Sequence, residues 1–378
     1  MPQVRLLHKG DPSFRWGSVG SRMANIDYEK EMVGTVDVPE ADKLDEAALT
    51  AWFEANVEDF EGPLTLSKFK GGQSNPTYKV ATSSRNYVLR RQPFGKLLPS
   101  AHAVDREYTV MSALGPTGFP VPRTFGLCED GDVIGSKFFV MELIQGRNLW
   151  NGALPDYQPD ERREIYHAMV DTLADLHTTD PQKIGLGDYG KPQDYCARQI
   201  ARWTKQYKLS ETEEIPEMEA LIAWLPETVP EQHASGIVHG DYRLDNMIFH
   251  AERNSVAAVL DWELSTLGDP IADFSYFVLN WHNPSDGRAG LGGKDLEALG
   301  IPTAEEVTQR YVERTGYPVP DMDWYFAFNL FKFAGIIQGI KKRVIDGTAS
   351  SAHAKQMSER VRPLVQSAYS FAKRAGLD

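Results

Sequence analysis

Two acidic segments in the second half of the chain carry residue types suited to metal and phosphate chemistry. The segment IVHGDYRLDN, residues 237–246, contains Asp241 and Asn246, and the segment VAAVLDWE, residues 256–263, contains Asp261. Each begins with an apolar run that reads as a strand, so both aspartates stand where a strand meets solvent. If the two strands end at one edge, two carboxylates and an amide oxygen converge. Oxygen ligands of this kind suit Mg²⁺, which usually keeps phosphates among its ligands.

Length and composition restrict the kind of protein that carries these residues. The 378 residues exceed one ordinary domain and predict two packed lobes. The formal net charge of -13 disfavours a nucleic-acid partner. The two cysteines, Cys128 and Cys196, lack metal-ligand spacing and disfavour a disulfide framework, which fits a reducing cytoplasm. No apolar run is long enough to cross a membrane, so we expect a cytoplasmic protein without membrane insertion.

The hydrophobic pattern divides the chain into three parts. Residues 1–43 mix glycine, proline, serine and charge without a sustained period, which predicts a loosely ordered leader. Residues 44–145 begin with a helix capped by Asp45 and continue with short strand-like runs that end on SKFFVMELI, residues 136–144, which predicts a small β-rich lobe. Residues 146–378 are dominated by helical periodicity, which predicts a larger helical lobe. The fold class is therefore α+β.

The same pattern predicts the positions of the individual elements. The strands of the small lobe are expected near 64–69, 76–81, 86–91 and 136–144. The later helices are expected near 102–114, 160–178, 192–208, 215–228, 303–315, 322–345 and 352–374. The two apolar runs of the large lobe, 236–241 and 256–263, are expected to form a hairpin-like pair.

The spacing of the polar residues resembles a known family. The pattern H-G-D-x-x-x-x-N at 239–246, followed by Asp261, resembles the catalytic loop and the metal-binding aspartate of the protein-kinase-like superfamily. The glycine after the histidine, and Trp262 after the second aspartate, are closer to its aminoglycoside phosphotransferase branch, which phosphorylates small molecules. The resemblance covers roughly residues 45–350. It implies a bilobal kinase-like fold that uses ATP and Mg²⁺.

The resemblance also implies roles for the loop residues. Asp241 would orient the substrate hydroxyl and accept its proton, and Asn246 and Asp261 would hold magnesium. Arg243 stands where protein kinases carry a lysine and would touch the γ-phosphate; the alternative is a solvated loop charge. His239 is expected to fix the loop through backbone hydrogen bonds rather than to act as an acid or base.

The small lobe resembles the nucleotide-binding half of the family. The segment FKGGQSNPTYKV, residues 69–80, resembles the phosphate-covering loop, and its alternative reading is a hairpin turn. The candidates for phosphate contact are Gly72, Gln73, Ser74 and Asn75. Arg90 replaces the family lysine and is expected to pair with Glu107, unless both are solvated surface charges. The strand FVMELIQG would place Glu142 and Ile144 at the adenine-binding hinge, or it is only a core strand.

Two further segments belong to the large lobe. In TLGDPIADFSYF, residues 266–277, Asp273 looks like the family's buried aspartate that braces the catalytic loop, and Asp269 is expected to cap the helix. The aromatic segment 322–333 is expected to form helix core rather than an acyl-chain pocket, because its rings recur at buried-face spacing.

The substrate is the least constrained part of the prediction. The segments GLGDYGKP and YCARQIARWTKQY, within 185–207, look more like the subfamily related to kinase-like domains fused to acyl-CoA dehydrogenases than like antibiotic-resistance enzymes. This implies a kinase for the hydroxyl of a small molecule, with a 4-hydroxyacyl-CoA as the leading candidate. One alternative acceptor is an aminoglycoside, a choline-like alcohol or a sugar-like alcohol. Another alternative is a catalytically silent nucleotide-binding regulatory module, which Arg90 favours and the complete set of loop residues disfavours.

Overall fold

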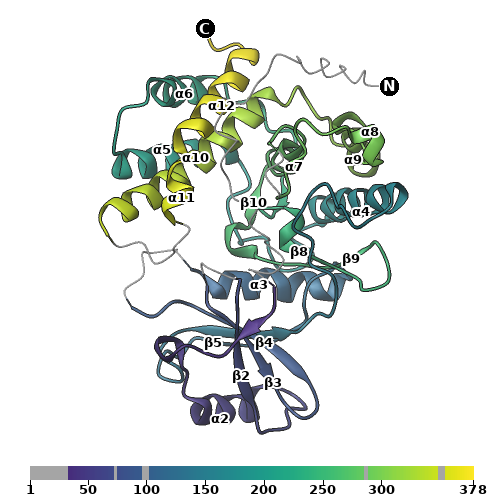
Figure 1. Ribbon diagram of the computed structural model, residues 1–378, viewed down its shortest axis with the longest axis vertical. Helices are drawn as coiled ribbons and strands as arrows, with labels where there is room; N and C mark the ends of the chain where they lie inside the picture. Colours follow the sequence, from purple (N-terminus) through teal and green to yellow (C-terminus); the bar gives the residue numbers. More distant parts are fainter. Residues whose placement is uncertain (1–32, 72–74, 96–101, 285–287, 348–353) are drawn as a thin grey trace.

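The small lobe is built on one antiparallel sheet. The computed structural model describes residues 33–71, 75–95, 102–284, 288–347 and 354–378, and the statements below concern these residues. Six strands hydrogen-bond in the order β1-β2-β3-β4-β6-β5 (Figure 1). Their bounds are β1 Thr35–Val36, β2 Thr65–Phe69, β3 Thr77–Ala81, β4 Asn86–Arg91, β5 Thr124–Cys128 and β6 Phe138–Glu142. The four predicted strands are confirmed as β2, β3, β4 and β6, whereas β1 and β5 were not predicted.

The sheet is covered by one helix on each face. Helix α2, Glu46–Asn56, begins at Asp45, whose carboxylate accepts a hydrogen bond from the backbone N–H of Ala48 at 2.9 Å. Helix α2 packs on the sheet face that carries Leu89, while α3, Val104–Leu114, packs on the opposite face. Strand residues alternate between these two faces with the period of two that a sheet imposes. The predicted capped helix is thereby confirmed.

Part of the expected N-terminal leader takes a defined place on this sheet. Residues 1–32 lie outside the described residues. Strand β1 pairs antiparallel with β2, and a short 3-10 turn, Glu40–Asp42, follows it. Asp42 forms ion pairs with Lys68 at 2.5 Å and with the buried Arg91 at 3.4 Å. These contacts tie residues 35–42 to the sheet.

The large lobe is helical and is arranged around α10, Asp323–Ile345, which packs against α5, α6, α7, α11 and α12. The other helices are α4 Pro159–Thr178, α5 Tyr195–Ser210, α6 Pro216–Glu227, α7 Pro270–Val278, α8 Leu296–Leu299, α9 Ala304–Thr315, α11 Ala354–Ser358 and α12 Val361–Arg374. The prediction of helix core for 322–333 is confirmed, because Trp324, Phe328 and Phe331 are buried. The bilobal α+β architecture predicted from the sequence is therefore confirmed (Figure 1).

The expected hairpin between the two apolar runs of the large lobe is wrong. Strand β7, Gly236–Val238, pairs with β10, Thr266–Gly268, and β8, Met247–Phe249, pairs with β9, Val256–Val259. Strand β8 lies close to β9 in the chain, so their pairing closes a shorter loop than a pairing of β7 with β9 would. The two runs therefore belong to two separate two-stranded sheets.

The helix predicted over 352–374 is divided into α11 and α12. Pro363 lies in the first turn of α12, where a missing backbone N–H costs no helical hydrogen bond. The proline therefore favours a helix start just before it, which α12 has. Among the described residues, no helix combines the length and apolar composition required to cross a lipid bilayer.

Candidate active site

The segment that follows β7, residues 239–246, is called the catalytic loop below. Its backbone turns at Gly240, where φ is +84° and an added Cβ would lie 2.8 Å from the carbonyl oxygen of Leu264. Asp273, in the first turn of α7, holds this turn. Its carboxylate accepts hydrogen bonds from the backbone N–H groups of His239 at 2.6 Å and Gly240 at 2.8 Å. These are the bracing contacts that the resemblance predicts for Asp273.

The bracing carboxylate is itself supported from the helical core. His177 of α4 lies 3.2 Å from Asp273 through Nε2, and its Nδ1 lies 2.6 Å from the hydroxyl of Tyr311. Burial alone would raise the pKa of Asp273, but His177 and the hydrogen bonds from the loop outweigh it and lower this pKa below its ordinary value. Asp269 caps α7 as predicted, because its carboxylate accepts from the N–H of Ile271 at 2.9 Å.

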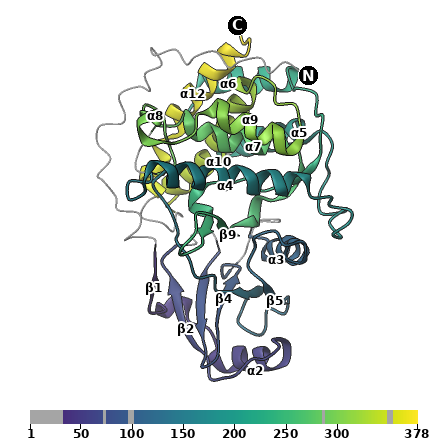
Figure 2. The same cartoon turned by 90° about the vertical axis from the view of Figure 1, so that its right-hand side faces the viewer.

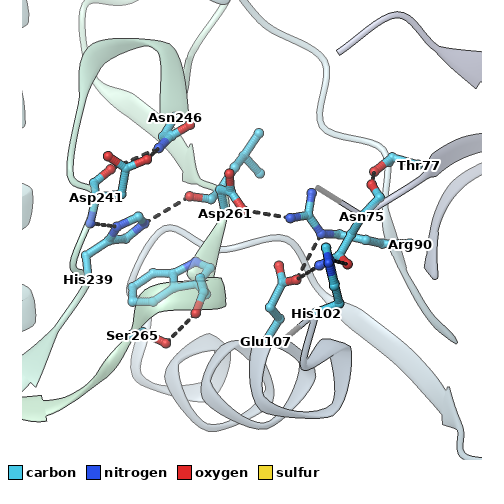
Figure 3. Close-up of polar contacts among 12 residues, drawn as sticks. Asn75, Thr77, Arg90, His102, Glu107, His239, Asp241, Asn246, Asp261 and Ser265 are labelled. Carbon is cyan, nitrogen blue, oxygen red and sulfur yellow. Dashed lines mark hydrogen bonds and ion pairs between the residues drawn. The ribbon is translucent and has the colours of Figure 1, made fainter. Parts of the chain in front are cut away.

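His239 connects the catalytic loop to the second acidic segment. Its Nε2 donates to the carbonyl oxygen of Leu260 at 2.9 Å, and its Nδ1 accepts from the backbone N–H of Asp241 at 3.2 Å (Figure 3). Its ring also lies against Trp262, with 4.7 Å between centroids. Both ring nitrogens are therefore engaged by backbone, which is the arrangement expected for a structural histidine.

The carboxylate of Asp241 is held by three side chains. Tyr276 donates its hydroxyl to Oδ1 at 2.6 Å, and Arg243 forms an ion pair with the same oxygen at 3.1 Å. Asn246 donates through Nδ2 to Oδ2 at 3.0 Å and to the backbone carbonyl of Asp241 at 2.9 Å (Figure 3). Burial keeps the pKa of Tyr276 well above its ordinary value, so its hydroxyl stays a donor. Among the residues that the structure describes, Oδ1 thus accepts a hydrogen bond from Tyr276 beside the Arg243 cation, and Oδ2 accepts one from Asn246.

Sequence reasoning missed Tyr276. It follows Asp273 by three residues on α7, so the two side chains lie on one face of the helix. The spacing of three between a bracing aspartate and a tyrosine is the signal that could have identified it.

Arg243 lies between two carboxylates. Besides Asp241, its guanidinium contacts Asp245 at 3.2 Å. Burial would lower the pKa of Arg243, but the two aspartates raise it above the ordinary arginine value. The structure places this charge at the catalytic loop, beside the residue expected to accept the proton.

Arg90 joins the two lobes. Its Nε donates to Oε1 of Glu107 at 3.0 Å, and its Nη2 donates to Oδ1 of Asp261 at 2.6 Å (Figure 3). The two carboxylates raise the pKa of Arg90 despite its burial, which by itself would lower it. The structure thus brings together three of the residues that the sequence predicted for the nucleotide and metal sites.

Glu107 is held in place by a second set of contacts. Asn75 donates through Nδ2 to Oε1 of Glu107 at 3.0 Å, and a ring nitrogen of His102 lies 3.1 Å from the Asn75 side-chain oxygen. Burial raises the pKa of Glu107 to about 7, against the lowering effect of Arg90. The Asn75 side chain therefore supports Glu107.

The oxygen atoms near Asp261 could hold a divalent cation. Asp261 takes left-handed backbone angles, φ 65° and ψ 62°, and the N–H of Leu260 before it donates to the Asn246 carbonyl at 2.8 Å. The amide nitrogen of Asn246 faces Asp241, which leaves its Oδ1 for a cation. Carboxylate oxygens of Glu107, Asp261 and Glu263 lie within 4.8 Å of one another. This all-oxygen set fits Mg²⁺. Sequence reasoning missed Glu263, two residues after Asp261.

The structure describes only some of the other residues that the sequence predicted to contact the nucleotide. Gly72, Gln73 and Ser74 lie outside the described residues. Glu142 ends β6 with its N–H bonded to the carbonyl of Arg123 at 2.8 Å, and Ile144 follows it, half-buried, in the connection between the lobes. Both therefore occupy the stretch where the chain passes from the small lobe to the large one.

Comparison with known proteins shows the family and the fold of the chain. A family model described as the phosphotransferase enzyme family matches residues 65–309. A candidate aminoglycoside phosphotransferase from Ralstonia eutropha is 49% identical, with a TM-score of 0.80 over 88% of this chain and 99% of that one. A thermostable mutant of aminoglycoside phosphotransferase APH(4)-Ia, solved with ADP and hygromycin B, is 14% identical, with a TM-score of 0.57 over 86% of this chain and 98% of that one. At that identity only the fold is shared.

A curated relative is a longer protein. Acyl-CoA dehydrogenase family member 10 from Mus musculus is 46% identical over 318 residues, which is 83% of this chain. The match spans 30% of the mouse protein, so the chain corresponds to less than a third of that relative. These comparisons confirm both parts of the resemblance predicted from the sequence, to aminoglycoside phosphotransferases and to proteins named for acyl-CoA dehydrogenases.

Proposed function

Because the chain belongs to the phosphotransferase enzyme family, we propose that it transfers the γ-phosphate of ATP to a hydroxyl group of a small molecule. The observation that carries the proposal is the fixed carboxylate of Asp241. Within the described residues, Oδ1 accepts a hydrogen bond from Tyr276 and lies 3.1 Å from the Arg243 cation, while Oδ2 accepts a hydrogen bond from Asn246. A carboxylate oxygen accepts two hydrogen bonds with ease, so Oδ2 has room for the hydroxyl of an acceptor.

The reaction then follows from this geometry. The acceptor hydroxyl donates to Oδ2 of Asp241, which orients the oxygen toward the γ-phosphorus. As the new O–P bond forms and the bond between the γ-phosphorus and the bridging oxygen breaks, the hydroxyl proton passes to Asp241 and ADP leaves. In this step the protein forms no covalent bond to the substrate, so the positioning of the reactants and the stabilisation of charge account for most of the catalysis.

Nucleotide binding is proposed for the residues between the lobes. In the described part of the chain, the Arg90 guanidinium uses Nε and Nη2 on carboxylates, and Nη1 is the donor that we propose for a phosphate oxygen. The backbone of Gly72, Gln73, Ser74 and Asn75 would approach the phosphates, and that of Glu142 and Ile144 would meet the adenine. The solved relative that contains ADP supports the binding of a nucleotide by this fold.

A magnesium ion is proposed at the oxygen atoms of Asn246 and Asp261. When bound, magnesium neutralises charge on the phosphate oxygens. Asp261 offers Oδ2, because its Oδ1 accepts from Arg90. Asn246 is aimed by its own amide, which donates to Asp241 and so turns its oxygen away from that residue. The one side chain of Asn246 would thereby orient the proposed proton acceptor, Asp241, through its N–H₂ group and hold the metal through its oxygen.

The acceptor proposed is a 4-hydroxyacyl-CoA. The supporting observation is the curated mouse relative, whose name refers to acyl-CoA. Aminoglycosides are the alternative that the names of the solved relatives favour, and choline-like and sugar-like alcohols complete the set of candidates.

Phosphate transfer from labelled ATP tests the proposal. Wild-type protein and Asp241→Asn would be incubated with magnesium and a panel of 4-hydroxyacyl-CoAs, choline, aminoglycosides and simple sugars. We expect transfer to one acceptor class and a loss of roughly 10²-fold or more in Asp241→Asn, as for a removed base. Asp346→Asn is the matched control, because Asp346 is exposed at the end of α10.

Two results would contradict this assignment. Equal losses of nucleotide affinity and rate in Asp241→Asn would mean that the residue does not act as the proton acceptor. Tight binding of magnesium and ATP without transfer to any acceptor would support the silent regulatory module, which the direct contact between Arg90 and Asp261 favours.

A further inference from the structure

Lys332 lies on α10 behind the catalytic loop. Its side chain is 8% exposed, and its Nζ donates to the carbonyl oxygen of Gly240 at 3.0 Å. The ammonium lies 5.9 Å from the ring centroid of Tyr276. No carboxylate of the described residues lies within ion-pair distance of it. Within the part of the chain that the structure describes, this buried cation uses one of its three N–H donors in a hydrogen bond, the one to Gly240.

The buried ammonium of Lys332 lowers the stability of the fold relative to an apolar side chain at the same position. An ammonium group without a paired carboxylate is unfavourable in a protein interior. Phe328 and Phe331 of α10 belong to the hydrophobic core of the lobe, and a methionine in place of Lys332 would keep the length of the side chain without its charge. Burial lowers the pKa of Lys332, and the nearby carboxylates of Asp273 and Asp241 act in the opposite direction. The charge is thus placed toward the catalytic loop.

The contacts of the loop show what Lys332 adds. Asp273 holds the N–H groups of His239 and Gly240, and the ring of His239 holds the N–H of Asp241. The carbonyl of Gly240, which belongs to the same peptide unit as the Asp241 N–H, is held by Lys332. Helix α7 therefore fixes one side of this backbone turn and α10 fixes the other.

We propose that Lys332 is a positioning residue for phosphate transfer. Through the Gly240 carbonyl it fixes the peptide unit on which Asp241 is mounted, and it supports the ring of Tyr276, which orients the Asp241 carboxylate. This inference rests on the proposed function, in which the carboxylate of Asp241 accepts the proton of the acceptor hydroxyl.

Lys332→Met tests the proposal, since methionine keeps the length of the chain and removes the charge and the donor. We expect kcat to fall by about 10²-fold, as for a small displacement of a catalytic group, with the affinity for magnesium and ATP unchanged. The melting temperature should stay the same or rise, because a buried unpaired charge is removed. Lys332→Arg, which keeps the charge and the donors, should recover most of the rate. Lys342→Met is the matched control on the exposed face of the same helix.

Amide hydrogen exchange adds a readout that requires no turnover. Exchange at residues 239–246 should be faster in Lys332→Met than in the wild type, and unchanged in Lys342→Met. Wild-type transfer with an unaffected Lys332→Met would overturn the inference and leave the proposed function intact. Unchanged exchange would overturn it even if the wild type transfers no phosphate. Parallel losses of rate and melting temperature that Lys332→Arg does not restore would identify a merely structural lysine.

Discussion

At the scale of single residues, the guanidinium of Arg90 performs a task that a lysine cannot reproduce in the same way. It donates from two different nitrogens to Glu107 and Asp261, one in each lobe. A lysine would offer a single charged atom at the end of a flexible chain. The departure from the family pattern at this position therefore changes how the small lobe is joined to Asp261, while the positive charge is retained.

Removal of Arg90 should lower the free energy of unfolding, because Glu107 would then be buried without its cation. Arg90→Met leaves that carboxylate without its cation, so we expect the free energy of unfolding to fall by about 3 kcal/mol. Arg90→Met/Glu107→Met removes both charges and should regain most of the loss. Urea unfolding of the wild type, both single variants and the double variant measures this coupling. Additive losses would show that the two side chains do not depend on each other.

Asp261 should determine binding of the metal-bound nucleotide. Asp261→Ala removes the carboxylate proposed to hold magnesium, so calorimetry should show that magnesium no longer strengthens nucleotide binding. Glu263→Ala separates this effect from a general loss of negative charge, because Glu263 belongs to the same carboxylate group. We expect a smaller effect from Glu263→Ala. Unchanged magnesium dependence in Asp261→Ala would refute the metal role.

At the scale of elements, the sequence predicted those helices and strands whose limits are set by residues close together in the chain. Asp45 and Pro270 mark the starts of α2 and α7, and short strand-like runs mark β2 to β4. The pairing of β7 with β10 was missed because β10 has three residues, too few to show a period. The contacts of Tyr276 and Lys332 with the catalytic loop were not predicted for a related reason. Both reach the catalytic loop from helices whose packing is decided by contacts distant in the chain.

Helix α3 illustrates how an element is attached by such distant contacts. Arg106 of α3 donates to the carbonyl oxygens of Tyr189 at 2.9 Å and Ser265 at 3.2 Å, and its guanidinium lies 4.2 Å from the Tyr189 ring centroid. The Tyr189 hydroxyl contacts the Ser265 hydroxyl at 2.6 Å and donates to the Arg106 carbonyl at 3.2 Å. The helix that carries Glu107 is thereby anchored to the large lobe.

Loss of the Tyr189 hydroxyl should loosen this anchor. Tyr189→Phe keeps the ring under Arg106 and removes two hydrogen bonds, each contributing about 1 kcal/mol. We expect faster amide exchange in α3 and unchanged exchange in β2 to β4, measured by mass spectrometry. Tyr157→Phe is a suitable control, because Tyr157 also lies near an arginine, Arg147, which donates to His250 and Arg253 of the large lobe. Faster exchange throughout the sheet would mean that α3 moves with the small lobe instead.

At the scale of the whole molecule, the two lobes share one core. Val88 and Phe139 on the α3 face of the sheet belong to the same hydrophobic cluster as the helices of the large lobe, whereas the α2 face has a cluster of its own. Two views at right angles place α3 between the sheet and the helical lobe (Figures 1 and 2). The sequence predicted two lobes, but a periodic pattern does not reveal which faces of them meet.

The bracing of the catalytic loop should also make the stability of the molecule depend on pH. The pKa of Asp273 is lowered in the folded state, so its contribution is fully present above the ordinary aspartate pKa of about 3.9 and is lost as pH falls below that value. Asp273→Asn removes the charge and turns an N–H₂ group toward backbone N–H donors. We expect a loss of about 3 kcal/mol near neutral pH, and a difference from the wild type that shrinks in acid.

The opposite shift at a second aspartate of the same helix provides the control. Burial raises the pKa of Asp269, so acid should favour the folded state at that site, and the difference between the wild type and Asp269→Asn should grow rather than shrink. Urea unfolding of the three proteins between neutral pH and about pH 3.5 measures both slopes. A difference for Asp273→Asn that stays constant over this range would show that the loop is held by shape alone. A shrinking difference would show that the charge of Asp273 holds the backbone on which Asp241 is mounted.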